Sequence, residues 1–109
     1  MNVIRYDKLI RDKIPEIIAK AGKEAVTEVI PEDEIKNALD RKLMEEVQEY
    51  LDSESEEEMQ EELADILEVL HGIASFTEIS WDGIEEKRLT KREERGGFEK
   101  RLCLLEVRE

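Results

Sequence analysis

Residues 43–51 read "LMEEVQEYL", and the fold of the chain depends on how this stretch is buried. Its apolar residues recur at helical spacing, which predicts one buried face of a helix. On a helical wheel of about 100° per residue, Glu46 falls inside that apolar face. Glu49 lies about 60° from Glu46, at the margin of the face. A carboxylate on a face that must be buried needs either a proton or a compensating positive charge.

The helix around this stretch extends over residues 31–53, and its first turn is acidic, as a helix N-terminus favours. A second long helix is predicted for residues 57–79, "EEMQEELADILEVLHGIASFTEI". Between them, the polar residues 53–58, "SESEEE", supply serines that can cap the second helix. So short a connection makes the two helices antiparallel neighbours.

The second helix repeats the arrangement of the first, because Glu62 falls within its apolar arc and Asp65 lies at the margin. If the two faces pack together, four carboxylates converge, and each would cost several kcal/mol without compensation. Oxygen ligands favour a hard divalent ion, Mg²⁺ before Mn²⁺ or Ca²⁺, and Mg²⁺ often binds substrate phosphates. Glutamate is abundant in this chain, so one such residue could fall there by chance. Its repetition at matched spacing favours a metal site.

The remaining segments predict one short helix, two strands and a third long helix. Residues 13–22 predict the short helix, with Pro15 in its first turn and Gly22 just past its end. Alternating apolar residues predict strands over 24–30 and 98–107, which we expect to pair. Residues 81–95 are helical by propensity. The expected fold class is mainly α, an antiparallel helical bundle with a small terminal β element, in one domain over residues 1–109.

Charge and composition limit the classes of partner. The net charge is −13 but is unevenly placed, because residues 31–80 hold 17 acidic against three basic residues. This acidic middle indicates either a solvated helical surface, which composition alone favours, or a cation site. We expect no nucleic acid polymer as partner. No apolar run approaches the roughly 20 residues that span a bilayer, and the first residues lack the apolar core of a signal peptide. We therefore expect no membrane partner and a cytoplasmic protein. The single cysteine, Cys103, is expected to be a buried strand residue.

The third long helix carries a basic stripe. Arg88, Lys91 and Arg95 project into one sector, with Lys87 beside it. Basic side chains gathered on one side can hold a polyphosphate and stabilise the charge that develops when a P–O bond breaks. The alternative is a solvated helix with ion pairs between neighbouring turns.

Two acidic motifs carry a family resemblance. "EEVQE" at 45–49 and "ELAD" at 62–65 resemble the EExxE…ExxD pattern of the MazG-like all-α nucleoside triphosphate pyrophosphohydrolases. The opening "YDKLIRDKIPEII" at 6–18 and the closing "KREERGGFEKR" at 91–101 are similar to a small branch described as phosphoribosyl-ATP pyrophosphohydrolase-like. The resemblance implies Mg²⁺-dependent cleavage between the α- and β-phosphates of a nucleoside triphosphate, in nucleotide-pool house-cleaning. The products are the monophosphate and pyrophosphate.

The resemblance also assigns roles to individual residues. It implies that Mg²⁺, or Mn²⁺, is bound by Glu46, Glu49, Glu62 and Asp65. The catalytic set is Glu45, Glu46 and Glu49, in which Glu45 orients or deprotonates the attacking water although it lies off the apolar arc. The substrate-binding set is Lys87, Arg88, Lys91, Arg95, Lys8 and Arg11. For Lys8 and Arg11, which belong to the opening motif, the roles left open are contact with an anion and a salt-bridged turn. Family members form homodimers or higher homo-oligomers. The alternative function is a non-catalytic acidic module that dimerises or senses nucleotides.

Overall fold

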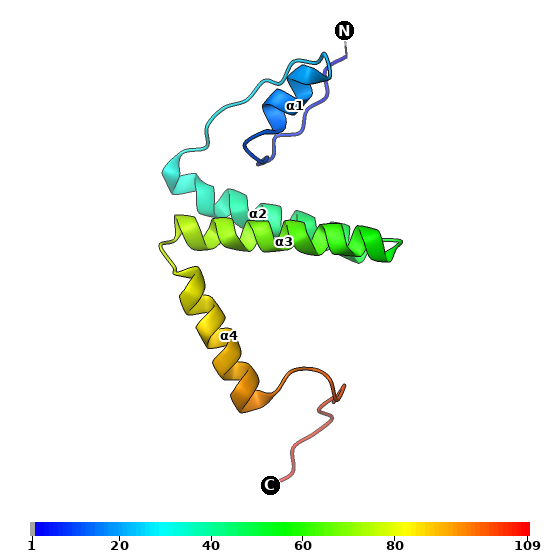
Figure 1. Cartoon of the computed structure of the whole chain (residues 1–109), viewed down its shortest axis with the longest axis vertical. Helices are drawn as coiled ribbons and strands as arrows, with labels where there is room; N and C mark the ends of the chain where they lie inside the picture. The colour runs from blue at the N-terminus through cyan, green and yellow to red at the C-terminus, as the bar shows by residue number, and fades with distance from the viewer. Residues whose placement is uncertain (1) are drawn as a thin grey trace. The chain divides into compact units, whose positions relative to one another are not determined.

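A computed structural model describes residues 2–109, and this part of the chain contains four α-helices and no β-strand (Figure 1). The helices are α1 (Ile14–Lys20), α2 (Glu32–Leu51), α3 (Glu56–Phe76) and α4 (Trp81–Arg95). The chain divides into two compact units, Met1–Glu78 and Ile79–Glu109, and each is described by itself. The mainly α fold class is confirmed, whereas the single domain over 1–109 stays a prediction.

Local signals in the sequence account for the ends of the helices. Ser55 caps α3, because its hydroxyl oxygen accepts a hydrogen bond from the backbone N–H of Glu58 at 3.1 Å. Ser80 caps α4 in the same way, with the N–H of Gly83 donating at 3.2 Å. Beyond the end of α4, Gly96 has φ 82°, a left-handed conformation that glycine adopts without steric cost. The sequence therefore located these helices to within a few residues.

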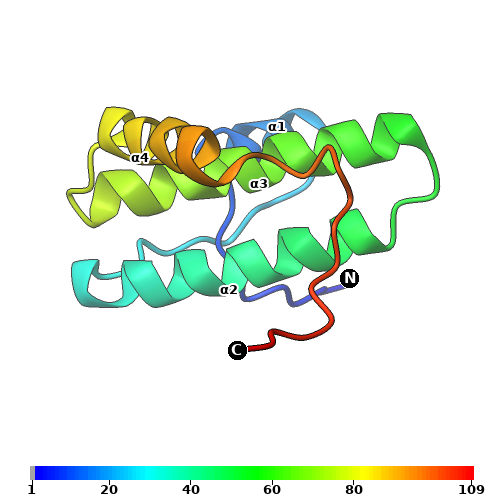
Figure 2. The ribbon, with the colours of Figure 1, turned by 90° about the horizontal axis from the view of Figure 1, so that it is seen from below.

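The first unit is organised around the hairpin of α2 and α3, which lie side by side in Figures 1 and 2. Among the described residues of this unit, no other pair of helices packs together. The buried apolar side chains of the hairpin are Ala38 and Leu39 from α2 and Val69 and Ala74 from α3. A Cβ at Gly72 would lie 3.2 Å from Leu39 Cδ2. The absence of a side chain at Gly72 thus leaves room for Leu39 against α3.

The predicted terminal β element is wrong. Neither 24–30 nor 98–107 forms a strand, and the side chains of Val26, Val29 and Phe98 are at least 90% exposed. Strand propensity mainly measures how well a side chain packs on a half-buried pleated surface, and an isolated two-stranded ribbon is marginal in water. The alternating apolar residues of these two segments have no neighbouring surface to pack on, so the segments do not form strands. Cys103, expected to be buried, is exposed for the same reason.

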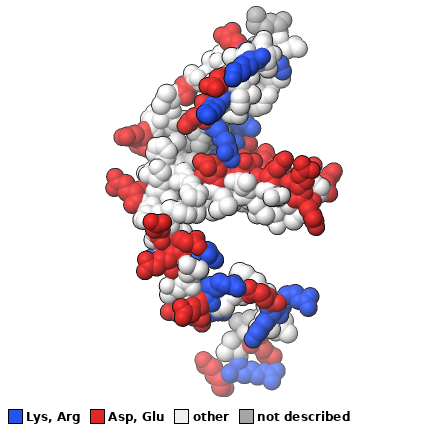
Figure 3. Space-filling view, in the orientation of Figure 1, with Lys and Arg blue, Asp and Glu red and all other residues white. Residues whose placement is uncertain are grey.

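Within the described residues, no helix is both long enough and apolar enough to cross a membrane. The long helices α2 and α3 instead carry acidic residues along their length, which Figure 3 shows in red over the hairpin.

Because the hairpin buries few apolar side chains, the loss of Leu39 should have a measurable effect on stability. Replacing it by alanine removes one of the few buried side chains, so Leu39→Ala should lower the free energy of unfolding by about 2–4 kcal/mol. Leu51→Ala is the matched control, because this leucine is 65% exposed and its loss should cost less than about 1 kcal/mol. Urea denaturation of both variants measures the difference. Equal losses would contradict the assignment of the core.

Candidate metal centre

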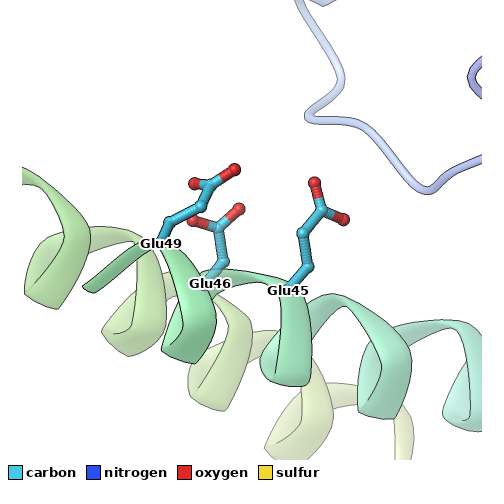
Figure 4. Close-up of side chains that lie close together, drawn as sticks. All are labelled: Glu45, Glu46 and Glu49. Atoms are coloured by element: carbon cyan, nitrogen blue, oxygen red, sulfur yellow. The ribbon is translucent and has the colours of Figure 1, made fainter. Parts of the chain in front are cut away.

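Helix α2 places three carboxylates close together on one side (Figure 4). They belong to Glu45, Glu46 and Glu49, and one oxygen from each lies within 4.8 Å of the others. The environments differ, because Glu46 is buried at 6% exposure, Glu45 is half-buried and Glu49 is exposed. The wheel excluded Glu45 from the buried face, yet its side chain reaches the same cluster.

Helix α3 brings two further acids to Glu46. Oxygens of Glu46, Glu62 and Asp65 lie within 4.8 Å of one another, and Glu46 belongs to both groups. Glu62 also contacts the carboxyl group of Glu49. The structure therefore brings together all four acids that the wheels selected, together with Glu45. We call these five residues the acid cluster.

Two oxygens of the acid cluster are buried and have no hydrogen-bond partner, Glu46 Oε2 and Glu62 Oε2. Leaving a buried acceptor unsatisfied costs roughly 1–3 kcal/mol, and more when the group is charged. The remaining oxygen of Glu46 has a single cationic contact, Lys42 Nζ at 3.3 Å. The two unpaired oxygens at the centre of the cluster can thus still bind a cation or a proton.

The pKa of Glu62 responds to this shortage of positive charge. Burial raises it, and the adjacent carboxyl groups of Glu49 and Glu46 raise it further, to about 7. A carboxyl group with this pKa is partly protonated at neutral pH. A bound divalent ion would oppose this shift of the pKa, because its positive charge favours the ionised form.

Basic side chains compensate the outer acids of the cluster. Glu45 Oε1 lies 3.2 Å from Lys8 Nζ and 3.4 Å from Lys42 Nζ, and Asp65 Oδ1 lies 2.6 Å from Arg11 Nη2. Burial alone would raise the pKa of Glu45, but the hydrogen bond from Lys8 and the charge of Lys42 lower it below its usual value. The hydrogen bond to Glu45 raises the pKa of Lys8.

The sequence analysis did not find Lys42, although its i, i+4 spacing to Glu46 was a usable signal. It did select Lys8 and Arg11, either as contacts for an anion or as part of a salt-bridged turn. In the structure both residues form salt bridges, and their partners are carboxylates of the acid cluster on α2 and α3.

The basic residues of α4 lie in the second unit. Lys87, Lys91 and Arg95 line one shallow surface of the helix, and Glu86 and Glu94 line the same surface. Arg88 is oriented differently, because its guanidinium group donates to Glu85 Oε1, with Nε at 2.9 Å. Arg88 therefore follows the ion-pair alternative, whereas the other three basic residues share a surface of mixed charge.

The donor set of the acid cluster fits a hard divalent cation. Carboxylate oxygens alone, supplied by two facing helices, suit Mg²⁺, Mn²⁺ or Ca²⁺ and offer no sulfur or imidazole ligand to a softer metal. Comparisons of the chain with protein-family models, with curated proteins and with solved structures find no match. The roles of these residues therefore rest on their geometry and on the motif resemblance.

The raised pKa of Glu62 predicts how stability depends on pH when no metal is present. The folded chain holds this proton up to about pH 7, whereas the unfolded chain releases it near 4.5. The stabilisation is therefore complete below about pH 4.5 and is lost as the pH rises toward 7. The thermal unfolding midpoint in a chelating buffer should fall between about pH 5 and 7 and level off above.

Glu62→Gln should flatten this part of the profile, and the exposed Glu68→Gln is the matched control that should retain it. A slope that survives unchanged in Glu62→Gln would show that another group is responsible.

Proposed function

We propose that the chain is a Mg²⁺-dependent nucleoside triphosphate pyrophosphohydrolase, which cleaves the bond between the α- and β-phosphates. The observation that carries this proposal is Glu46. Its carboxylate is buried between acids of two helices, and one of its oxygens has no partner. A buried carboxylate in this setting is explained by a cation that binds it, and a carboxylate-bound Mg²⁺ is well suited to phosphate chemistry.

Two roles are proposed within the acid cluster, metal binding and orientation of a water molecule. Glu46, Glu49, Glu62 and Asp65 would hold the ion, which polarises a phosphate and activates water when bound. Glu45 is kept ionised by Lys8 and Lys42, so it is suited to accept a hydrogen bond from water. Its lowered pKa makes it better at orienting a water molecule than at retaining the proton of that water.

The second unit by itself is proposed to bind polyphosphate through three basic residues of α4. Lys87, Lys91 and Arg95 share one face of the helix, and all three are exposed. Several cations on one face match the charge of a triphosphate, which is spread over many oxygens. Arg88 is the weaker candidate, because its guanidinium group already donates a hydrogen bond to Glu85.

The competing function is a non-catalytic acidic module that dimerises or senses nucleotides. It would need the same helices but would not need turnover at the acid cluster. The raised pKa of Glu62 is compatible with it, whereas the unsatisfied oxygen of Glu46 favours a site that binds a cation.

A panel of nucleoside triphosphates, assayed for pyrophosphate release with Mg²⁺ or Mn²⁺, tests the activity. At least one nucleotide should be cleaved, and Glu46→Gln or Asp65→Asn should lower kcat/KM by about 100-fold or more, because each removes a metal ligand. Glu68→Gln is the control and should be within about twofold of the wild-type chain.

No pyrophosphate with any nucleotide and either metal would show that the proposed activity is wrong. Saturable nucleotide binding without product would support the sensing alternative.

We also propose that the chain assembles as a homodimer or a higher homo-oligomer. Beyond the face that packs on α2, helix α3 has a second apolar surface lined by Met59, Leu63, Ala64 and Leu67. Leu63 is 47% exposed and Leu67 is 51% exposed. The hairpin buries few apolar side chains of its own, and a small core of this kind usually needs further support. A second copy covering this surface would complete a bundle of four helices.

Charged substitutions on this surface should separate the copies. Leu63→Glu and Leu67→Glu should each weaken self-association by tenfold or more, because a buried leucine contributes about 1.5–3 kcal/mol. Light scattering after size exclusion measures the mass over a range of concentrations. Leu105→Glu is the control, since this residue is 88% exposed and lies outside α3. A wild-type chain that is monomeric at every concentration would contradict the assembly.

A further inference from the structure

The N-terminal segment contributes two cations to the acid cluster, one on each helix of the hairpin. Lys8 Nζ donates to Glu45 Oε1 on α2 at 3.2 Å. Arg11 Nη2 donates to Asp65 Oδ1 on α3 at 2.6 Å. The two donors are three residues apart in the sequence, yet their acceptors belong to different motifs. The segment therefore holds both acidic motifs at the same time.

These ion pairs lie at the rim of the acid cluster. The side chains of Lys8 and Arg11 are 40% and 55% exposed, and those of Glu45 and Asp65 are 31% and 39% exposed. Ion pairs with this exposure are weak because water screens them, so a divalent ion can compete with them for the carboxylates. The buried oxygens of Glu46 and Glu62 are not satisfied by either cation.

Leu9 and Ile10, which lie between the two cations in the sequence, are half-buried, so the segment is also held by apolar contacts. Helix α1, which follows it, does not pack on α2 or α3. Lys8 has one further partner within the segment, because its Nζ lies 5.6 Å from the centre of the Tyr6 ring. The two ion pairs are the polar links between this segment and the cluster, and their side chains can exchange partners without changing the packing of α2 on α3.

We infer that Lys8 and Arg11 are exchangeable counter-ions of the candidate metal centre. When a divalent ion is bound, Arg11 would leave Asp65 and Lys8 would leave Glu45, which Lys42 still keeps ionised, and the released guanidinium and ammonium groups would bind phosphate oxygens of the substrate. This inference rests on the proposed function and adds to it a role for the N-terminal segment. Lys8 and Arg11 exchange one set of anionic oxygens for another, so they stay close to the site throughout. Arg11 suits phosphate in particular, because its planar guanidinium group can donate two parallel hydrogen bonds.

Metal binding without nucleotide gives the first test. Mn²⁺ affinity is measured by electron paramagnetic resonance for the wild-type chain, Lys8→Gln, Arg11→Gln and the control Arg5→Gln. Arg5 carries the same charge and lies in the same segment, but it pairs with Asp7 rather than with the cluster. Lys8→Gln and Arg11→Gln should each bind Mn²⁺ about two- to fivefold more tightly, whereas Arg5→Gln should match the wild type.

Phosphate binding gives the second test, and its expected effect has the opposite sign. Calorimetry at saturating Mn²⁺, with inorganic pyrophosphate as the probe, should show about tenfold weaker binding in Lys8→Gln and Arg11→Gln, because each loses a charge-assisted hydrogen bond. A purely structural role would weaken both ligands together. Arg11→Lys keeps the charge, so its Mn²⁺ affinity should stay near that of the wild type.

The two tests separate the inference from the function on which it rests. If the wild-type chain binds Mn²⁺ and the two glutamine variants bind it no more tightly than Arg5→Gln, the exchange is wrong and the metal centre stands. Unchanged pyrophosphate affinity in both glutamine variants would likewise overturn the transfer to phosphate. A wild-type chain that binds no Mn²⁺ would overturn the proposed function itself.

Discussion

The burial of carboxylates between α2 and α3 is the constraint on which the other features of the hairpin depend. Glu46 occupies a place where a helix pair would ordinarily bury an apolar side chain, and Glu62 faces it from the other helix. Two such charges repel each other and lose hydration, so the hairpin is stable only if protons or cations compensate them. Natural sequences break local packing rules in this way mainly at functional sites.

The positive charge that compensates the carboxylates differs between the rim and the interior of the acid cluster. At the rim, Lys8, Lys42 and Arg11 satisfy Glu45 and Asp65, and the pKa of Glu45 is lowered accordingly. In the interior, positive charge is short, so the pKa of Glu62 is raised. Opposite shifts within one cluster of carboxyl groups follow from their different access to cations. The outer acids are thus paired with cations, whereas the inner carboxyl groups of Glu46 and Glu62 each keep one oxygen without a partner.

Sequence periodicity predicted the helices well because each helix satisfies its own backbone hydrogen bonds and needs only one apolar stripe to pack. It failed for 24–30 and 98–107, because a strand exists only if another strand satisfies its backbone groups. For the acids, the wheel located Glu46 and Glu62 correctly within the apolar faces. It misplaced Glu45, because a wheel records the direction of Cα–Cβ and ignores the reach of a flexible side chain.

The sequence by itself determined the helical hairpin and the four acids that come together along it, because 3.6-residue periodicity and i, i+3 spacing are local properties of the chain. Only the tertiary structure decided which cations compensate those acids. Lys8 and Arg11 lie 37 and 54 residues from their partners, and no local pattern encodes a contact over that separation. The same structure decided that one oxygen of Glu46 is left without a partner, because burial and hydrogen bonding depend on every neighbouring atom.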